Sequence, residues 1–155
     1  MANADNKCAN LEIVDLHKDS KDTLGDLMNA QKDLQEDVFN YDFENMTLRE
    51  IKDFWFLNKH SEDDETNEMF DALGGINDGI GSGVWKNWKK SYAKGLEMKI
   101  KDLTEDDRKE LFFEFIDKLH FVFNYAISIG MEPSEVYNYY MAKQNENRDR
   151  QKRGY

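Results

Sequence analysis

The stretch Leu111-Phe-Phe-Glu-Phe-Ile-Asp-Lys-Leu-His-Phe-Val-Phe-Asn-Tyr-Ala-Ile127 decides the fold. It is so apolar that it predicts an α-helix buried on most of its sides. Two acids inside it, Glu114 and Asp117, stand one helical turn apart and therefore share a face. Burying an ionised carboxylate costs several kcal/mol unless a cation or hydrogen bonds compensate. The pair therefore predicts a partner of opposite charge.

A second acid pair, Glu65-Thr-Asn-Glu68, has the same spacing. If the two pairs face each other, carboxylates about 4 Å apart repel by roughly 4 kcal/mol at an effective dielectric constant near 20. A divalent cation relieves that repulsion, and ligands that are all oxygen favour Mg²⁺ or Mn²⁺ over zinc. Because Mg²⁺ commonly bridges carboxylates and substrate phosphates, we expect a phosphorylated substrate. For the first pair alone, a solvated acidic face is an equal alternative.

A di-iron four-helix bundle is a competing interpretation of the acids. It needs two Glu-x-x-His units, and only Asp117-Lys-Leu-His120 has such a spacing. Neither His17 nor His60 follows an acid by three positions. His120 is therefore expected to be a core residue or to support a ligand.

Composition restricts the class of protein. The 155 residues predict one domain over 1–155, and the single Cys8 excludes an intrachain disulfide framework. No N-terminal apolar stretch resembles a signal peptide or a membrane span, so we expect a cytoplasmic protein without membrane contact. The net charge of −11, from 32 acidic and 21 basic residues, disfavours binding of nucleic acid.

Alternating strand patterns are missing, so we expect an all-α bundle of about six helices. The first expected helix is 20–39, with an apolar stripe of Leu24, Leu27, Met28, Leu34 and Val38. The second is opened by the capping box Thr47-Leu-Arg-Glu50 and turns Ile51, Phe54 and Trp55 toward the core, and the third runs from 61–64 to Gly74. The fourth is 84–100, with Trp85, Trp88 and Tyr92 on one face; the fifth is capped by Thr104 and ends near Gly130; the sixth runs from Pro133 into a basic tail. The glycine-rich stretch 74–83 is expected to be a mobile connector.

Several polar residues admit two interpretations. Gln31 and Asn124 interrupt apolar faces, and their amides either read a pyrimidine edge or cross-link helices. Trp55 either stacks on a base or packs in the core, and Lys59 either meets a phosphate or is solvated. The basic tail either complements the helix dipole or offers a surface for triphosphate oxygens. Its cations are Lys143, Arg148, Arg150, Lys152 and Arg153.

The ordered motifs resemble a known family. They are Glu65-x-x-Glu68, Glu114-x-x-Asp117-x-x-His120-Phe121 and Lys143-x-x-x-Asn147-x-x-Arg150-Gln151-x-x-Gly154-Tyr155. The set resembles the all-α dUTPase superfamily of nucleoside triphosphate pyrophosphohydrolases, which includes dimeric dUTPases and MazG-like proteins. The closer likeness is to the dCTPase-dUTPase type of T-even phages, which has a similar insertion at about 74–103.

This resemblance implies a phage-encoded enzyme of the host cytoplasm that controls the pyrimidine nucleotide pool. It would cleave dCTP, dUTP or both between the α and β phosphorus atoms. Mg²⁺ would be held by Glu65, Glu68, Glu114 and Asp117, and Glu65 or Glu68 would also act on the attacking water. The base would contact Gln31, Trp55 and Asn124. The phosphates would contact Lys59, Lys143, Asn147, Arg150 and Tyr155.

Two other functions remain open from the residues. One is a catalytically silent interaction protein that uses a Trp85, Trp88 and Tyr92 face. The other is a related house-cleaning pyrophosphohydrolase for modified or purine nucleotides. Whichever function holds, the helix around Glu114 is apolar all round, because it also carries Phe112, Phe115 and Phe123. This predicts a homodimer that shares the helix.

Overall fold

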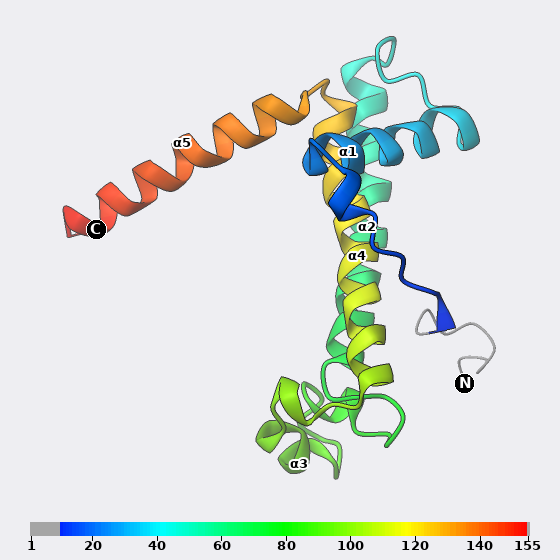
Figure 1. Ribbon diagram of the computed structural model, residues 1–155, viewed down its shortest axis with the longest axis vertical. Coiled ribbons are helices and arrows are strands. Elements are labelled where there is room, and N and C mark those ends of the chain that lie inside the picture. Colours follow the sequence, from blue (N-terminus) through cyan, green and yellow to red (C-terminus); the bar gives the residue numbers. More distant parts are fainter. Residues whose placement is uncertain (1–9, 155) are drawn as a thin grey trace. The chain divides into compact units, whose positions relative to one another are not determined.

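The computed structural model describes residues 10–154, and this part of the chain is helical without a strand. Figure 1 shows the five α-helices of the described residues. They are α1 (Thr23–Asp33), α2 (Leu48–Ala72), α3 (Tyr92–Glu97), α4 (Glu105–Ser128) and α5 (Pro133–Lys152). The prediction of an all-α fold is confirmed, with five such helices instead of about six.

The chain divides into two compact units. One combines Met1–Val14 with Phe56–Val122, and the other combines Asp15–Trp55 with Phe123–Tyr155. Two of the three boundaries fall within long helices, α2 and α4, and the third lies between Val14 and Asp15. The single domain over 1–155 stays a prediction.

The predicted helix ends at caps and turns are confirmed. The Glu50 carboxylate accepts from the Thr47 backbone N–H at 2.7 Å, and the Thr47 hydroxyl accepts from the Glu50 N–H at 3.3 Å. The Thr104 hydroxyl accepts from the Asp107 N–H at 3.1 Å at the start of α4. Gly130 follows α4 with a φ of 73°, and Pro133 occupies the first turn of α5.

The predicted helix boundary near 61–64 is wrong, because α2 runs without a break through Ser61. A serine in mid-helix is tolerated when its hydroxyl bonds to the carbonyl one turn earlier, and Ser61 donates to the Leu57 carbonyl at 3.4 Å. Lys59 and Asp63 add an ion pair at helical i,i+4 spacing, at 2.7 Å. The acidic residues therefore belong to the middle of one long helix.

The helix predicted over 84–100 is also wrong. Only α3 is α-helical there, and Trp85 and Trp88 lie in the turns before it. The reason is close packing of glycine: a Cβ on Gly81 would stand 1.9 Å from the Asp71 carbonyl oxygen, and one on Gly95 3.2 Å from the Val84 backbone. Most glycines of the stretch 74–83 are buried among turns, while 77–79 are exposed. That this stretch is a mobile connector stays a prediction.

The unit that contains α1 and α5 has its own core. Its buried and partly buried apolar residues are Met28, Phe43, Ile51, Phe54, Ile127, Leu24, Tyr41, Met46, Phe123, Ala126 and Val136. The predicted stripe of α1 is only partly inside, since Leu27 and Leu34 are half-exposed and Val38 is exposed. Gln31 and Gln35 are buried in their place. Past Asp33 the helix continues as a π turn over Leu34–Val38, which rotates the later apolar residues outward.

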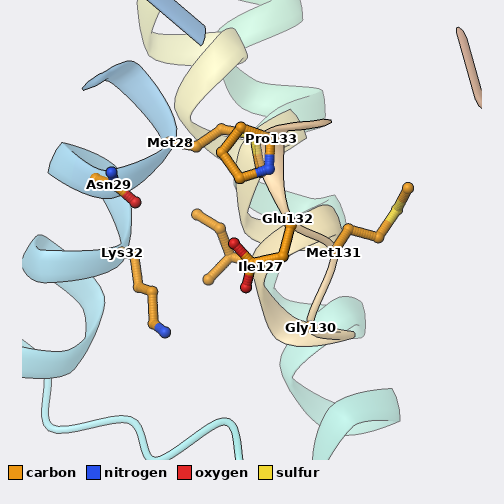
Figure 2. A pocket seen from close by; sticks show the side chains of 8 residues that line it. All are labelled: Met28, Asn29, Lys32, Ile127, Gly130, Met131, Glu132 and Pro133. Atoms are coloured by element: carbon orange, nitrogen blue, oxygen red, sulfur yellow. The ribbon is translucent and has the colours of Figure 1, made fainter. Parts of the chain in front are cut away.

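A small cavity of about 70 Å³ lies where α1 meets the turn after α4. Figure 2 shows its lining, which includes Met28 and Lys32 from α1, Gly130 and Glu132 from the turn, and Pro133 at the start of α5. Ligand sites for small molecules usually enclose about 300–1,000 Å³. This cavity is therefore too small to take a nucleotide.

None of the described helices combines the length and apolarity that crossing a membrane requires.

Candidate active site

The acidic residues of α2 and α4 form a cluster within one compact unit. Glu65, Glu68 and Glu114 each offer one carboxylate oxygen, and these oxygens lie within 4.8 Å of one another. Glu65 and Glu114 are half-buried, whereas Glu68 is exposed. The structure therefore brings together three of the four predicted metal ligands. Asp117, the fourth, lies outside that 4.8 Å set, and its carboxylate stands 3.7 Å from His120 Nδ1.

The four carboxylates affect one another electrostatically. Burial, followed by the charges of Glu68, Glu110, Asp117 and Glu65, raises the pKa of Glu114 from 4.5 to about 7. Burial and the charges of Glu68, Asp117 and Asp64 raise the pKa of Glu65. Every named cause raises the pKa of these two groups, so the cluster carries repulsion, and no cation is among the causes named within the described residues. Two carboxylates 4.8 Å apart repel by about 3 kcal/mol at an effective dielectric constant of 20.

The donor set fits a hard divalent cation. Three carboxylates from two helices supply only oxygen atoms, which Mg²⁺ and Mn²⁺ prefer and which suit zinc less well. One exposed ligand, Glu68, leaves an open side toward solvent. A cation there would still have positions for water and substrate oxygens.

The predicted base-contacting residues lie in the other compact unit. Gln31 Nε2 donates to Asn124 Oδ1 at 2.8 Å, and both side chains are buried. Their amides therefore cross-link α1 and α4, which is one of the two predicted interpretations. Trp55 is partly exposed, donates to the Ser128 hydroxyl at 2.8 Å and contacts the Tyr125 ring edge-on.

The predicted phosphate-contacting residues are spread over both units. Lys59 is paired with Asp63 on α2. On α5, Asn147 and Arg150 line a shallow depression together with Gln144, Arg148 and Gln151. Arg150 donates to Glu146 at 2.9 Å, and Arg150 and Arg153 together lower the pKa of Glu146. Lys143 is exposed on the same helix, and Tyr155 lies outside the described residues.

Sequence reasoning gave no role to a group of residues that join α2 to α4. Asn58 Nδ2 donates to the Phe121 carbonyl at 2.8 Å, and Lys118 Nζ contacts Glu62 and Thr66. Asn58 is 3% exposed, but its place in the sequence between Leu57 and Lys59 gives no sign that it is buried. A lysine in a helix is usually solvated, so Lys118 carried no signal either.

An all-α chain whose two long helices bring three carboxylates together has the make-up of a phosphohydrolase of the all-α class. Two phage proteins named dCTP pyrophosphatase are similar to it. The one from Enterobacteria phage T4 is 32% identical over 167 residues, which cover 97% of this chain and 98% of that protein. The chain belongs to the phage dCTP pyrophosphatase family.

The other relative, from Enterobacteria phage LZ5, is 45% identical over 94 residues, which cover 59% of this chain and 55% of that protein. The match thus spans about half of that relative. A protein of phage T4 named DNA replication protein is 32% identical over 155 residues, 89% of this chain and 40% of that protein. No family model and no solved structure matches.

Proposed function

We propose that this protein hydrolyses dCTP to dCMP and pyrophosphate, with dUTP as a second substrate, and that it needs Mg²⁺. The observation that carries the proposal is the cluster of Glu65, Glu68 and Glu114 in a chain that matches the T4 dCTP pyrophosphatase over nearly its whole length. The setting is the cytoplasm of an infected host, where the reaction limits the pool of these nucleotides.

The carboxylates have two tasks in the proposed reaction. Glu65, Glu68, Glu114 and Asp117 hold the cation. When bound, a divalent cation supplies positive charge to the phosphate oxygens and acidifies a water molecule. Glu65 or Glu68 takes the proton of the attacking water. The water oxygen forms a bond to the α phosphorus, the bond from that phosphorus to the bridging oxygen breaks, and pyrophosphate leaves.

The remaining side chains bind the substrate. Gln31 and Asn124 bind the pyrimidine edge, which requires exchange of their mutual hydrogen bond for the base, and Trp55 contacts the face of the base. An amide that turns over offers a donor in place of an acceptor, so one site can accept cytosine and uracil. Lys59, Lys143, Asn147, Arg150 and Tyr155 bind the phosphates. For Arg150 this requires exchange of its Glu146 partner for a phosphate oxygen.

The first prediction concerns the reaction itself. Purified protein with Mg²⁺ is expected to release pyrophosphate from dCTP and from dUTP, but not from dATP or dGTP, because the two amides match a pyrimidine edge. Chromatography of the nucleotide products and an enzymatic pyrophosphate assay measure this. Release of inorganic phosphate with dCDP as the product would contradict cleavage at the α phosphorus. Preference for a purine or modified nucleotide would instead favour the house-cleaning alternative.

We also propose a homodimer. The face of α4 beside the carboxylates exposes Phe112 and Phe115 by about half, with Ile116 and Val122 also partly exposed. On α2 the neighbouring Phe56 and Leu57 are 68% and 59% exposed. So much apolar surface within one compact unit is more than an isolated small protein usually leaves in water.

The second prediction tests this dimer. Light scattering at micromolar concentration is expected to give twice the mass of 18.3 kDa. Replacing Phe115 by Glu places a charge in the apolar face and is expected to give the monomer mass. Phe39→Glu is the control, because Phe39 is equally exposed but lies on the other compact unit. A monomer mass for the unchanged protein would refute the proposal.

The silent interaction protein has less support. Its aromatic face required Trp85, Trp88 and Tyr92 on one helix, and only Tyr92 lies on α3. Trp85 donates to Asp71 at 2.6 Å and lies beside Phe70.

A further inference from the structure

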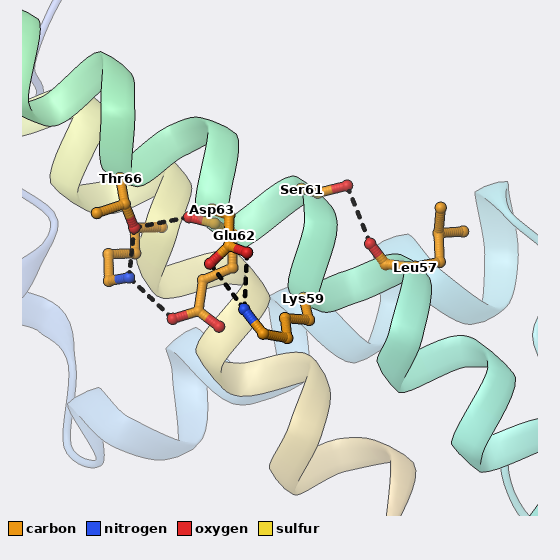
Figure 3. A network of polar contacts seen from close by, with 7 residues as sticks. Leu57, Lys59, Ser61, Glu62, Asp63 and Thr66 are labelled. Atoms are coloured by element: carbon orange, nitrogen blue, oxygen red, sulfur yellow. Dashed lines mark hydrogen bonds and ion pairs between the residues drawn. The ribbon is translucent and has the colours of Figure 1, made fainter.

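A lysine on α4 joins that helix to α2 one turn away from the carboxylates. Lys118 Nζ donates to Glu62 Oε1 at 2.8 Å and to the Thr66 hydroxyl at 2.7 Å. The Thr66 hydroxyl in turn donates to the Glu62 backbone carbonyl at 2.7 Å. Figure 3 shows Glu62 and Thr66 side by side on α2 within this network. The Lys118 and Glu62 side chains are about one quarter exposed, so this ion pair is partly shielded from water.

This contact belongs to a regular series along the two helices. Asn58 meets the Phe121 carbonyl, and one turn further along α2 Glu62 meets Lys118. One turn beyond that, Glu65 and Glu68 meet Glu114. Each turn forward on α2 corresponds to one turn backward on α4, so the helices are antiparallel here. The register that the polar contacts define is therefore the register at which the carboxylates converge.

The carboxylates themselves oppose this register. Like charges within 4.8 Å repel, and apolar contact between helices is not directional enough to hold one register against repulsion. A partly buried ion pair with a second hydrogen bond is directional and resists sliding. Lys118 supplies both bonds from a single ammonium group.

Lys118 Nζ donates to Glu62 and Thr66, which are not among the three clustered carboxylates. The causes that raise the pKa of Glu65 and Glu114 are burial and other carboxylates, and Lys118 is not among them. The hydrogen bond from Lys59 is the main cause that lowers the pKa of Asp63, and the charge of Lys118 is a smaller one. The two bonds of Lys118 therefore act on the cluster through the position of the helices.

We propose that Lys118 is a positioning residue for the metal site: by bridging Glu62 and Thr66 it holds α4 in the register that brings Glu114 to Glu65 and Glu68. This inference rests on the proposed function, because it takes the three carboxylates to be metal ligands. Residues that orient ligands without touching the metal typically affect metal affinity by 10–100-fold.

Mn²⁺ binding at pH 8, measured by the electron paramagnetic resonance of the free ion, tests the proposal. Lys118→Met is expected to weaken Mn²⁺ binding about tenfold. Lys118→Arg keeps both bonds and is expected to stay within about threefold of the unchanged protein. Thr66→Val removes one of the two acceptors and is expected to be intermediate. dCTP hydrolysis by Lys118→Met is expected to be low at limiting Mn²⁺ and to recover at saturating Mn²⁺.

The matched control is Lys86→Met. Lys86 pairs with Asp71 at 3.5 Å, its side chain is as exposed as that of Lys118, and it also links separate segments of the same unit. Its removal is expected to leave Mn²⁺ affinity unchanged even if it lowers the melting temperature. If Lys118 had a merely structural role, Lys118→Met and Lys86→Met would have similar Mn²⁺ affinities and similar melting temperatures.

The sign of the change separates geometry from charge. If Lys118 acted only by its positive charge, Lys118→Met would bind Mn²⁺ more tightly, and this outcome would overturn the proposal. Unchanged affinity would overturn it too, while leaving the proposed function intact if dCTP is still hydrolysed. If Lys118→Met does not fold, the Mn²⁺ affinities of Thr66→Val and Lys118→Arg test the proposal instead. An unchanged protein that binds no Mn²⁺ overturns both proposals.

Discussion

Replacing Glu114 by Gln is expected to reduce kcat/KM for dCTP by roughly a thousandfold, the largest effect of any single substitution in this protein. Glu114 is the ligand that α4 contributes to the cluster with Glu65 and Glu68. An amide keeps the size of the side chain but loses its charge, and the loss of roughly 4 kcal/mol of transition-state stabilisation corresponds to three orders of magnitude in rate. Steady-state kinetics at fixed Mg²⁺ measure the effect.

The same substitution is expected to stabilise the metal-free protein at pH 8. The pKa of Glu114 is raised from 4.5 to about 7, so between these values the folded chain keeps a proton that the unfolded chain has lost. Stability therefore falls as pH rises through this window, by on the order of 2 kcal/mol for this partly exposed group. Gln avoids the loss, so the melting temperature should rise by a few degrees at pH 8 and change little at pH 4.5.

A control on the same helix is Glu105→Gln. Glu105 is exposed in the first turn of α4, away from the cluster, so neither activity nor the pH dependence of stability should change by much. Full activity in Glu114→Gln would show that the carboxylate cluster is not the catalytic site.

The second large effect is a loss of metal affinity in mild acid. A carboxylate must be ionised to bind a cation, so protons and metal compete for Glu114. With a pKa of about 7, roughly nine tenths of this group is ionised at pH 8 and roughly one tenth at pH 6. The apparent affinity for Mn²⁺ should therefore fall about tenfold between these pH values.

Glu114→Gln provides the internal comparison for this measurement. It should bind Mn²⁺ weakly at both pH values and show little change between them, because the titrating group is gone. Isothermal calorimetry in two buffers of different protonation enthalpy reports the proton released on binding. Affinity that is flat from pH 6 to pH 8 in the unchanged protein would exclude Glu114 as the titrating ligand.

The sequence predicted the acid pairs because helical spacing is a local property. Residues three apart share a helix face wherever the helix forms, so Glu65 with Glu68, and Glu114 with Asp117, could be grouped before any contact was known. That the two pairs face each other was only a condition, and the structure brings Glu114 but not Asp117 into the 4.8 Å set with Glu65 and Glu68. The caps at Thr47 and Thr104 and the turn at Gly130 are local as well. The caps and the turn were confirmed for that reason.

The features that sequence missed depend on contacts between distant residues. Ser61 looked like a helix start, but it stays in α2 because its hydroxyl bonds back to Leu57. Trp85 and Trp88 have helical spacing, yet packing at Gly81 and Gly95 holds their segment in turns. A pattern of residue types contains no information on such close approaches.

Surface apolar residues are a third case. Leu34 and Val38 were expected on the apolar stripe of the first helix, yet both are substantially exposed. Phe112 and Phe115 were expected outside the inward-facing set, and they are about half exposed, whereas Phe123 packs against the core. The sequence predicts that an apolar face is buried. Whether it is buried against the same chain or against a second copy depends on the assembly. The roles of Gln31, Trp55 and Asn124 likewise depend on a bound base.

Crystals grown with Mn²⁺ and a non-hydrolysable dCTP analogue give the most direct test of the central claim, that the carboxylates of α2 and α4 hold the catalytic cation. The anomalous signal of manganese is expected as a peak at about 2.2 Å from oxygens of Glu65, Glu68 and Glu114, with a phosphate oxygen of the analogue completing the shell. A bound analogue with manganese elsewhere, or with no manganese near these three side chains, would contradict it.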